Sequence, residues 1–310
     1  MAHIKRKKST LKEKFQKNYQ DILFCVLILI YPTVQFIVFY LGVNLNTIAL
    51  SFQQFDYDAG YTWAGFANFK LAFRNIFHEA TFGMAIGNSV LYQVVAIAAG
   101  MTLSLFFAYY IYLNKPFAKF FKVMLFMPAV ISSIVLTVIF RKVVGDLYSE
   151  IASGIANEFV PGLLVTPNTQ KATLFFYNLF FSFGTTVLLY SGAMSGTNES
   201  VMEYAEVDGA NYLQKFFYVL FPMIFQTFTT FMVMHVADTF MNQMFLLGFF
   251  ADAAPYQVQT VGYYLYAETL SATLGEYPLL ATYGLIFTIV TVPVVFLVKR
   301  LLERYGPNAY

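Results

Sequence analysis

Three polar side chains near the end of one long apolar run are best placed to do chemistry. His235 lies inside the uncharged run 216–237, and Asp238 and Asn242 follow it. Residues at i, i+3 and i+7 share one face of a helix, so the spacing predicts that these three side chains point the same way. An imidazole beside a carboxylate can relay a proton, whereas a carboxylate and an amide can bind hydroxyl groups. A hydrated structural pair at a membrane surface is the third interpretation.

Other kinds of reactive site are not found in the sequence. No Gly-x-x-x-x-Gly-Lys-Ser/Thr segment occurs, so the chain has no P-loop to hold nucleotide phosphates. The histidines, His3, His78 and His235, are too scattered for a metal cluster, and no Ser/His/Asp spacing suggests nucleophilic catalysis. Cys25 is the only cysteine, which excludes an intrachain disulfide. We therefore expect neither an enzyme nor a metal site.

The composition indicates that these residues belong to a membrane protein. Hydrophobic residues make up 58% of the chain and charged residues 12%, whereas soluble domains carry about 25% charged residues. About 20 apolar residues cross a bilayer, and a charge at the centre of a membrane helix costs about 2.5 to 3.5 kcal/mol. The uncharged runs long enough, or nearly so, are 22–54, 81–114, 123–140, 172–198, 216–237 and 277–298. We expect an all-α integral membrane protein with six transmembrane helices, the first ending near Gly42.

The distribution of lysine and arginine predicts the orientation of these helices. Most of the 19 basic residues lie in the N-terminal tail, in the segments after the second and fourth runs, and after the sixth run. By the positive-inside rule, both termini and the segment 198–215 should be cytoplasmic. The connections 44–82, 141–171 and 238–276 should then be outside.

A polar island, residues 198–222, separates the fourth and fifth runs. Asn198 can cap the first turn of a helix. Gly209 should end that helix, because glycine readily takes the left-handed conformation of a helix C-terminus. The pattern predicts a short helix, a sharp bend at 208–210 and a second short helix that leads into the next span. A plain connector with no partner is the alternative interpretation.

This island resembles the EAA signature of the membrane-spanning subunits of binding-protein-dependent ABC importers. The signature reads Glu-Ala-Ala, three residues, Gly, nine residues and Ile-x-Leu-Pro. Glu203-Tyr204-Ala205, Gly209 and Val219-Leu220-Phe221-Pro222 keep this spacing, and Asp208-Gly209-Ala210 is the form common in the sugar-transporting branch. The departures are Tyr204 for the second Ala, Val219 and Phe221 for Ile and Leu, and Asn198 where Pro is usual.

The resemblance implies the transmembrane domain of a type I ABC importer, in which this segment is the coupling helix that docks on the ATPase. The implied ATPase-coupling residues are Glu203, Tyr204, Ala205, Asp208, Gly209, Ala210 and Pro222. The chain itself is expected to bind no cofactor, since ATP and magnesium belong to the partner ATPase. The implied partners are two ATP-binding subunits, a second permease subunit of different sequence, an extracytoplasmic solute-binding protein and membrane lipid, with no nucleic acid.

Weaker resemblances extend from the first span to about Arg304. Gly65-Phe66-Ala67-Asn68-Phe69 is similar to an element found after the first helix of sugar-type permeases, although its aromatic residues could equally be interfacial anchors. Gly184 occupies the family's glycine position in the fourth span, and the simpler interpretation is that it lets another helix approach closely. We expect a cytoplasmic tail 1–21, a permease domain 22–304 and a tail 305–310. The resemblance implies a multi-pass protein of a bacterial or archaeal cell membrane that forms the pathway for a mono- or oligosaccharide.

The predicted topology places possible pathway residues of two spans at one level. The fourth span runs inward and the fifth outward, so Tyr177 and Asn178 should lie beside the group His235, Asp238 and Asn242 near the external mouth. Substrate contact and gating or structural pairing are both consistent with such a group. The alternative function is a secondary transporter or channel with a proton relay through His235 and Asp238.

Overall fold

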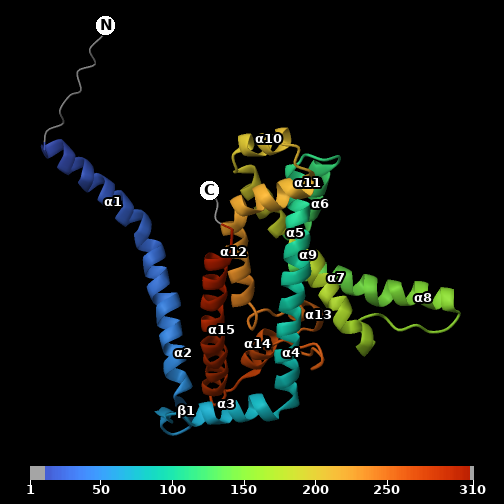
Figure 1. Ribbon diagram of the computed structural model, residues 1–310. Helices are drawn as coiled ribbons and strands as arrows, with labels where there is room; N and C mark the ends of the chain where they lie inside the picture. Colours follow the sequence, from blue (N-terminus) through green and yellow to red (C-terminus); the bar gives the residue numbers. More distant parts are fainter. Residues whose placement is uncertain (1–10, 308–310) are drawn as a thin grey trace.

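The structure, a computed structural model, describes residues 11–307. The remaining residues, which include parts of the predicted tails 1–21 and 305–310, lie outside the described residues. Long helices dominate the fold (Figure 1). The α-helices are α1 (Leu11–Gln35), α2 (Val43–Ser51), α3 (Ala67–His78), α4 (Ala80–Val95), α5 (Thr102–Tyr112), α6 (Ala118–Val130), α7 (Ser133–Lys142), α8 (Tyr148–Ala156), α9 (Pro167–Ser195), α10 (Glu199–Val207), α11 (Tyr212–Gln214), α12 (Phe221–Ala237), α13 (Leu246–Phe250), α14 (Val261–Ser271) and α15 (Tyr277–Tyr305). Four π-helical stretches join some of them: η1 (Phe36–Gly42), η2 (Ala96–Met101), η3 (Val143–Leu147) and η4 (Lys215–Leu220).

Five helical stretches within residues 11–307 are long and apolar enough to cross a membrane. They are Asp21–Ser51, Ala80–Tyr112, Pro167–Ser195, Tyr212–Ala237 and Tyr277–Tyr305. Each contains one of the uncharged runs expected to span the bilayer, or most of it. A sixth span exists only if the bent pair Ala118–Val130 and Ser133–Ala156 is counted as one.

The expectation of one helix over 123–140 is wrong. Helix α6 ends at Val130, α7 begins at Ser133, and the two parts are bent by 101°. Pro128 has no N–H to donate within the last turn of α6, and Ser132 has the extended backbone of a helix N-cap, with ψ 129°. The second part continues through η3 and α8 to Ala156, so the predicted outer connection 141–171 is partly helical.

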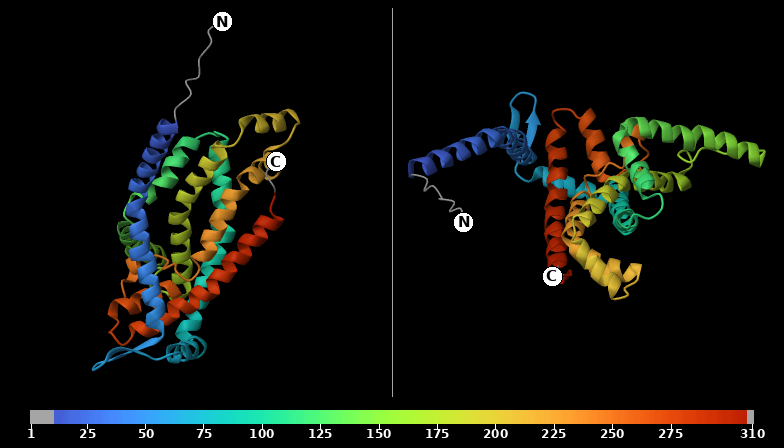
Figure 2. Two further views of the ribbon diagram at one scale, coloured as in Figure 1. Left: turned by 90° about the vertical axis from the view of Figure 1, so that its left-hand side faces the viewer. Right: turned by 90° about the horizontal axis from the view of Figure 1, so that it is seen from above.

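The first span is longer than expected. Gly42 has helical dihedral angles of φ −59° and ψ −48°, and the helix continues through it to Ser51 instead of ending there. Helix α2 packs along α15, whereas the side chains from Asp21 to Gly42 are all exposed. Seen from above, α1 and α8 extend away from the bundle in opposite directions (Figure 2).

A small β-hairpin follows the first span, so the described chain is not all-α. Strand β1 (Gln53–Asp56) pairs antiparallel with β2 (Gly60–Trp63). The Phe52 and Trp63 rings stack at 5.5 Å. Asn68 is buried and donates to the carbonyl oxygens of Ser51 and Gln53 at 3.0 and 2.7 Å. The predicted aromatic segment after the first span therefore fastens this hairpin to α3.

One buried cluster of the bundle lies where α5 and α9 pack against η4 and the start of α12, and α6 packs along α9 beside it. A Cβ atom added to Gly184 of α9 would lie 1.8 Å from the carbonyl oxygen of Leu125 in α6. This contact confirms the helix-packing interpretation of Gly184, because only a residue without a side chain lets the two backbones approach so closely. Helix α10 lies at the end of the bundle where α1 begins and α15 ends (Figure 1).

Candidate functional site

Residues 198–214 form an exposed helix–turn–helix, which we call the knob. The Asn198 side chain accepts a hydrogen bond from Ser200 N at 3.1 Å and caps α10. Gly209 has φ +79°, and a reciprocal capping box between Asn211 and Gln214 starts α11. The predicted helix, bend and second helix are thus confirmed, and the left-handed glycine is what folds the knob back on itself.

The surface of the knob is acidic and apolar. Glu203 is exposed, as are Asp208 and Gly209, and the exposed fractions of Tyr204 and Val207 are 71% and 85%. Ala205 and Ala210 are partly buried. Nothing lies within 4 Å of a Cβ atom added to Gly209, so within this chain only the backbone conformation requires glycine there. Large exposed apolar side chains among carboxylates are typical of a surface that receives a protein partner.

An ion pair holds the base of the knob. Lys215 Nζ lies 2.8 Å from Glu206 Oε2, and the lysine is almost fully buried. The hydrogen bond and the charge of Lys215 hold the pKa of Glu206 below its usual value. The carboxylate therefore stays ionised at pH values where an ordinary glutamate begins to accept a proton.

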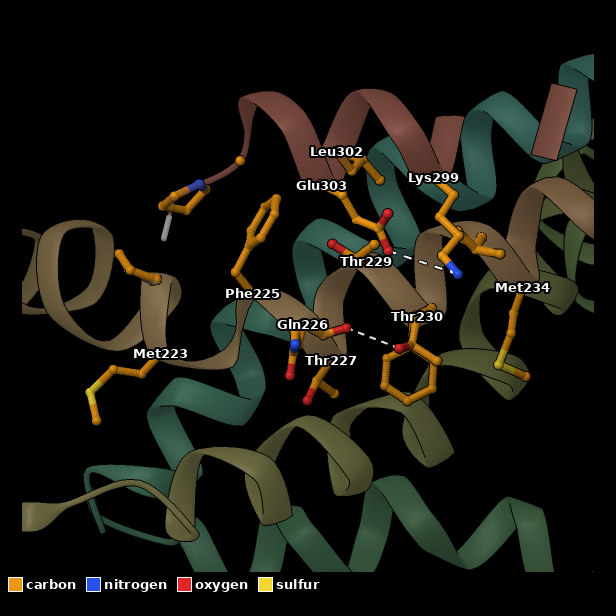
Figure 3. Close-up of a pocket in the computed structure, with 15 residues that line it drawn as sticks. Met223, Phe225, Gln226, Thr227, Thr229, Thr230, Met234, Lys299, Leu302 and Glu303 are labelled. Atoms are coloured by element: carbon orange, nitrogen blue, oxygen red, sulfur yellow. Dashed lines mark hydrogen bonds and ion pairs between the residues drawn. The ribbon is translucent and has the colours of Figure 1, made fainter. Parts of the chain in front are cut away.

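A cavity of about 1030 Å³ lies between α12 and the C-terminal part of α15, at the same end of the bundle as the knob (Figure 3). Pro222 lies at one edge of this cavity. Thr230 Oγ1 donates to the Gln226 carbonyl oxygen at 2.9 Å, and Lys299 Nζ lies 3.8 Å from Glu303 Oε1 one turn along α15. Its lining includes Met223, Phe225, Gln226, Thr227, Thr229, Thr230, Met234, Lys299 and Glu303. Hydroxyl, amide and aromatic groups together suit a polar ligand with apolar faces.

The polar group at the opposite end of α12 differs from the expected helical face. Helix α12 ends at Ala237, so Asn242 lies in the turns beyond it. Asn242 Nδ2 donates to Asp238 Oδ2 at 2.9 Å, and Asn242 Oδ1 accepts from Met244 N at 2.7 Å. Asp238 thus pairs with Asn242, and no hydrogen bond joins it to His235 among the residues that the structure describes.

Tyr177 and Asn178 lie at the expected level but are enclosed. Asn178 Nδ2 donates to the carbonyl oxygen of Met244 at 3.0 Å, and its Oδ1 has no partner in the described part of the chain. Tyr177 is 1% exposed, with the rings of Phe181 and Phe249 at 4.4 and 4.8 Å. Tyr177 therefore packs in an aromatic cluster, whereas Asn178 borders a small internal cavity.

That cavity, of about 40 Å³, brings Asn178 together with His235 and with residues that the sequence interpretation missed. Its polar lining includes Tyr92, Ser104, Asn178, Ser182, Thr186 and His235. Tyr92 of α4 also lies beside Asp238 and Asn242. The available signal was the polar face of α4, since Asn88, Ser89, Tyr92 and Gln93 recur at helical spacing and are all buried.

Comparison with known proteins gives consistent matches to one family. The profile described as "Binding-protein-dependent transport system inner membrane component" matches residues 96–308. The chain is 25% identical over 203 residues to the probable ABC transporter permease protein YurN of Bacillus subtilis, covering 62% of this chain and 66% of that protein. It is 26% identical over 195 residues to the arabinooligosaccharides transport system permease protein AraP of the same organism, covering 61% and 60%.

A third relative is the maltose/maltodextrin transport system permease protein MalF of Salmonella typhimurium, 24% identical over 183 residues, with 58% of this chain and 35% of the relative covered. The matches thus span less than two thirds of the length of each of these relatives.

Solved structures share the fold over nearly the whole chain. A chain of a bacterial ABC transporter involved in the import of the acidic polysaccharide alginate superposes with a TM-score of 0.76 at 19% identity, covering 95% of this chain and 100% of that one. A chain of a bacterial alginate ABC transporter, in complex with an alginate pentasaccharide-bound periplasmic protein, gives 0.77 at 18% identity, covering 95% and 99%. At this identity the likeness concerns the fold.

Proposed function

Because this chain belongs to the family of binding-protein-dependent transport system inner membrane components, we propose that it is a transmembrane permease subunit of an ABC importer for a carbohydrate. The observation that carries the proposal is the knob. An exposed, acidic and apolar helix–turn–helix with a left-handed Gly209 lies at one end of a bundle of apolar helices. Such a surface can pass the movement of a soluble subunit to the membrane helices.

We propose six spans, with the bent pair of α6 and α7 as the third, and both termini in the cytosol with the knob. The positions of most basic residues support this orientation. The start of α1 and the end of α15 lie toward the same end of the molecule as α10 (Figure 1). The proposed domains are the tail 1–21, the permease domain 22–304 and the tail 305–310, in the cell membrane of a bacterium or archaeon.

In the proposed cycle, this chain contributes positions and movements rather than bond chemistry. A solute-binding protein delivers the carbohydrate to the outer face, and two ATP-binding subunits, which hold ATP and magnesium, close beneath this chain and a second permease. Their closure displaces the knobs and biases the helix bundle between two states. The proposed docking residues are Glu203, Tyr204, Ala205, Asp208, Gly209 and Ala210, with Pro222 where the following helix begins.

The proposed pathway follows α12. At its outer end Asp238 and Asn242 would bind sugar hydroxyls, with His235 and Asn178 behind them and Tyr177 supporting them by packing. At its inner end the sugar would pass the cavity beside Gln226 and Thr230. Relatives and structural neighbours support a saccharide as the transported substrate. The names of AraP and MalF refer to arabinooligosaccharides and to maltose and maltodextrin, and the similar solved structure belongs to an importer of alginate.

A proton relay through His235 and Asp238 is not favoured, because the described residues contain no hydrogen bond between the two side chains.

The test begins with an affinity-tagged chain purified as an intact complex and identified by mass spectrometry. The complex is then placed in proteoliposomes with its binding protein, and ATPase activity and uptake are measured with maltotriose, arabinotriose and alginate trisaccharide. We expect a copurifying second permease and ATPase, and ATP-dependent uptake of at least one saccharide. ATP-independent uptake driven by a pH gradient would contradict the proposal.

A further inference from the structure

A buried lysine connects the knob to the membrane span that follows it. Lys215 is the first residue of η4 and is 7% exposed. Its only salt bridge within residues 11–307 is with Glu206 of α10, at 2.8 Å. A buried ammonium group is costly unless a charged partner stays in place. The position of Glu206 relative to the start of η4 is therefore strongly constrained.

A second set of contacts ties the same point to the turn between α5 and α6. Lys115 Nζ lies 4.0 Å from the centroid of the Tyr212 ring, and Lys215 Nζ lies 5.7 Å from it. Tyr109 of α5 donates its hydroxyl to the Tyr212 carbonyl oxygen at 2.9 Å. Both lysines also favour the ionised form of Glu206. Three segments of the chain thus meet around Tyr212 and the ion pair.

Helix α10 has few other attachments to the bundle. Its one buried residue is Met202, which packs in the core with residues of α5 and α9. Between α10 and the ends of the neighbouring helices lies a cavity of about 410 Å³, bordered by Glu199, Glu203, Glu206 and Lys215. Force applied to α10 can therefore reach the span through two points, Met202 and the Glu206–Lys215 pair. Met202 reaches η4 through apolar packing, in one cluster with Phe216 and Leu220, whereas the Glu206–Lys215 pair is the only salt bridge between α10 and η4 among the described residues.

We propose that Lys215 is a positioning residue for coupling, which acts through Glu206 to make α10 and α12 move as one body. The inference rests on the proposed function and adds a residue outside the docking surface. When an ATPase subunit displaces α10, the ion pair carries the displacement to η4 and on to the polar face of α12. Without the pair, α10 can tilt into the cavity beneath it while α12 stays in place. ATP hydrolysis then no longer drives the helix movement.

The test uses the complete complex in proteoliposomes, with the saccharide that stimulates the wild-type ATPase most. Glu206→Gln and Lys215→Met should each lower the amount of saccharide transported per ATP about tenfold, the size expected for one charge-assisted hydrogen bond. Lys215→Arg should stay near wild type. The double variant Glu206→Lys with Lys215→Glu restores the pair in reverse and should recover transport per ATP to within about threefold. A packing role alone would not predict recovery by reversal.

The matched control is Glu199→Gln, which also removes a carboxylate from α10. Glu199 has no salt bridge among the described residues. It should leave transport per ATP unchanged. The proposal is overturned if Glu206→Gln and Lys215→Met couple normally in assembled complexes, or if the reversed pair is no better than either single variant. Should Lys215→Met fail to assemble, Glu206→Gln decides, because the Glu206 side chain is 76% exposed. A wild-type complex without saccharide-stimulated ATPase would instead refute the proposed function.

Discussion

At the scale of single residues, one backbone angle sets the shape of the knob. Gly209 has φ +79° and open space around it, so its substitution tests conformation and not crowding within this chain. Gly209→Val should reduce saccharide-stimulated ATPase activity strongly, because the left-handed region costs an L-residue about 1 to 2 kcal/mol and a β-branched residue is a genuine outlier there. Gly209→Asn should retain most of it, since asparagine visits this region more readily.

The measurement is ATPase stimulation and uptake in complexes shown to contain every subunit. Normal coupling by Gly209→Val would mean that the bend does not matter for coupling.

Asp238 offers a second test at this scale. Its Oδ2 accepts a hydrogen bond from Asn242 at 2.9 Å, and an amide oxygen can accept the same bond. Asp238→Asn should therefore lower the uptake rate only a few fold, whereas Asp238→Ala should lower it about tenfold to a hundredfold, since a hydrogen bond to a charged group contributes about 1.5 to 3 kcal/mol.

Uptake rate and preference among the three test saccharides are the quantities to compare. Unchanged uptake and preference in both Asp238→Ala and Asn242→Ala would make this group an interfacial structure without a transport role.

At the scale of helices, two glycines of α9 form a matched pair. A Cβ atom added to Gly184 would lie 1.8 Å from the Leu125 carbonyl oxygen. A Cβ atom added to Gly192 would have nothing within 4 Å. Gly184→Ala should lower the thermal stability of the purified complex clearly, because α6 would have to move. Gly192→Ala should leave stability unchanged or raise it by up to about 1 kcal/mol through helix propensity.

Fluorescence-detected size-exclusion after heating reports both variants in the same experiment. Equal melting temperatures for the two would show that α6 and α9 are not in contact at Gly184.

The helices could be predicted from the sequence where the residue types alone determine where a helix lies and where it ends. Five of the six uncharged runs correspond to continuous helical spans, and Asn198 and Gly209 delimit α10 as their chemistry requires. The break at 131–132 was not predicted, because the residues on both sides are equally apolar and a charge count registers no difference. The pairing of Asp238 with Asn242 instead of His235 depends on α12 ending at Ala237. Beyond that end the chain makes a contact that is distant in sequence, since Thr260 Oγ1 donates to the Asn242 carbonyl oxygen at 2.7 Å.

At the scale of the whole molecule, orientation can be measured directly. In a chain with Cys25→Ser, a cysteine introduced at position 200 should react with an impermeant maleimide only from the cytosolic side. One introduced at position 58, in the turn of the hairpin, should react only from the outside. Right-side-out and inside-out vesicles give the two measurements. Labelling of position 200 from the outside would overturn both the topology and the docking assignment.

The continuous helical span from Tyr212 to Ala237 fixes both the distance and the rotational orientation between the knob and the polar face of α12. Each helical residue turns the chain by a set angle, about 100° in an α-helix and less in the π-helical η4. The number of residues between Gly209 and Pro222 therefore sets the direction of the knob relative to the polar face of α12. The fixed number of residues between the glycine and the proline of the family signature thus sets the rotation of the knob about the helix axis. Deleting Tyr218 should turn the knob away from its partner and abolish stimulated ATPase activity. Inserting one alanine after Gln214 in the same chain should bring the phase, and the activity, back.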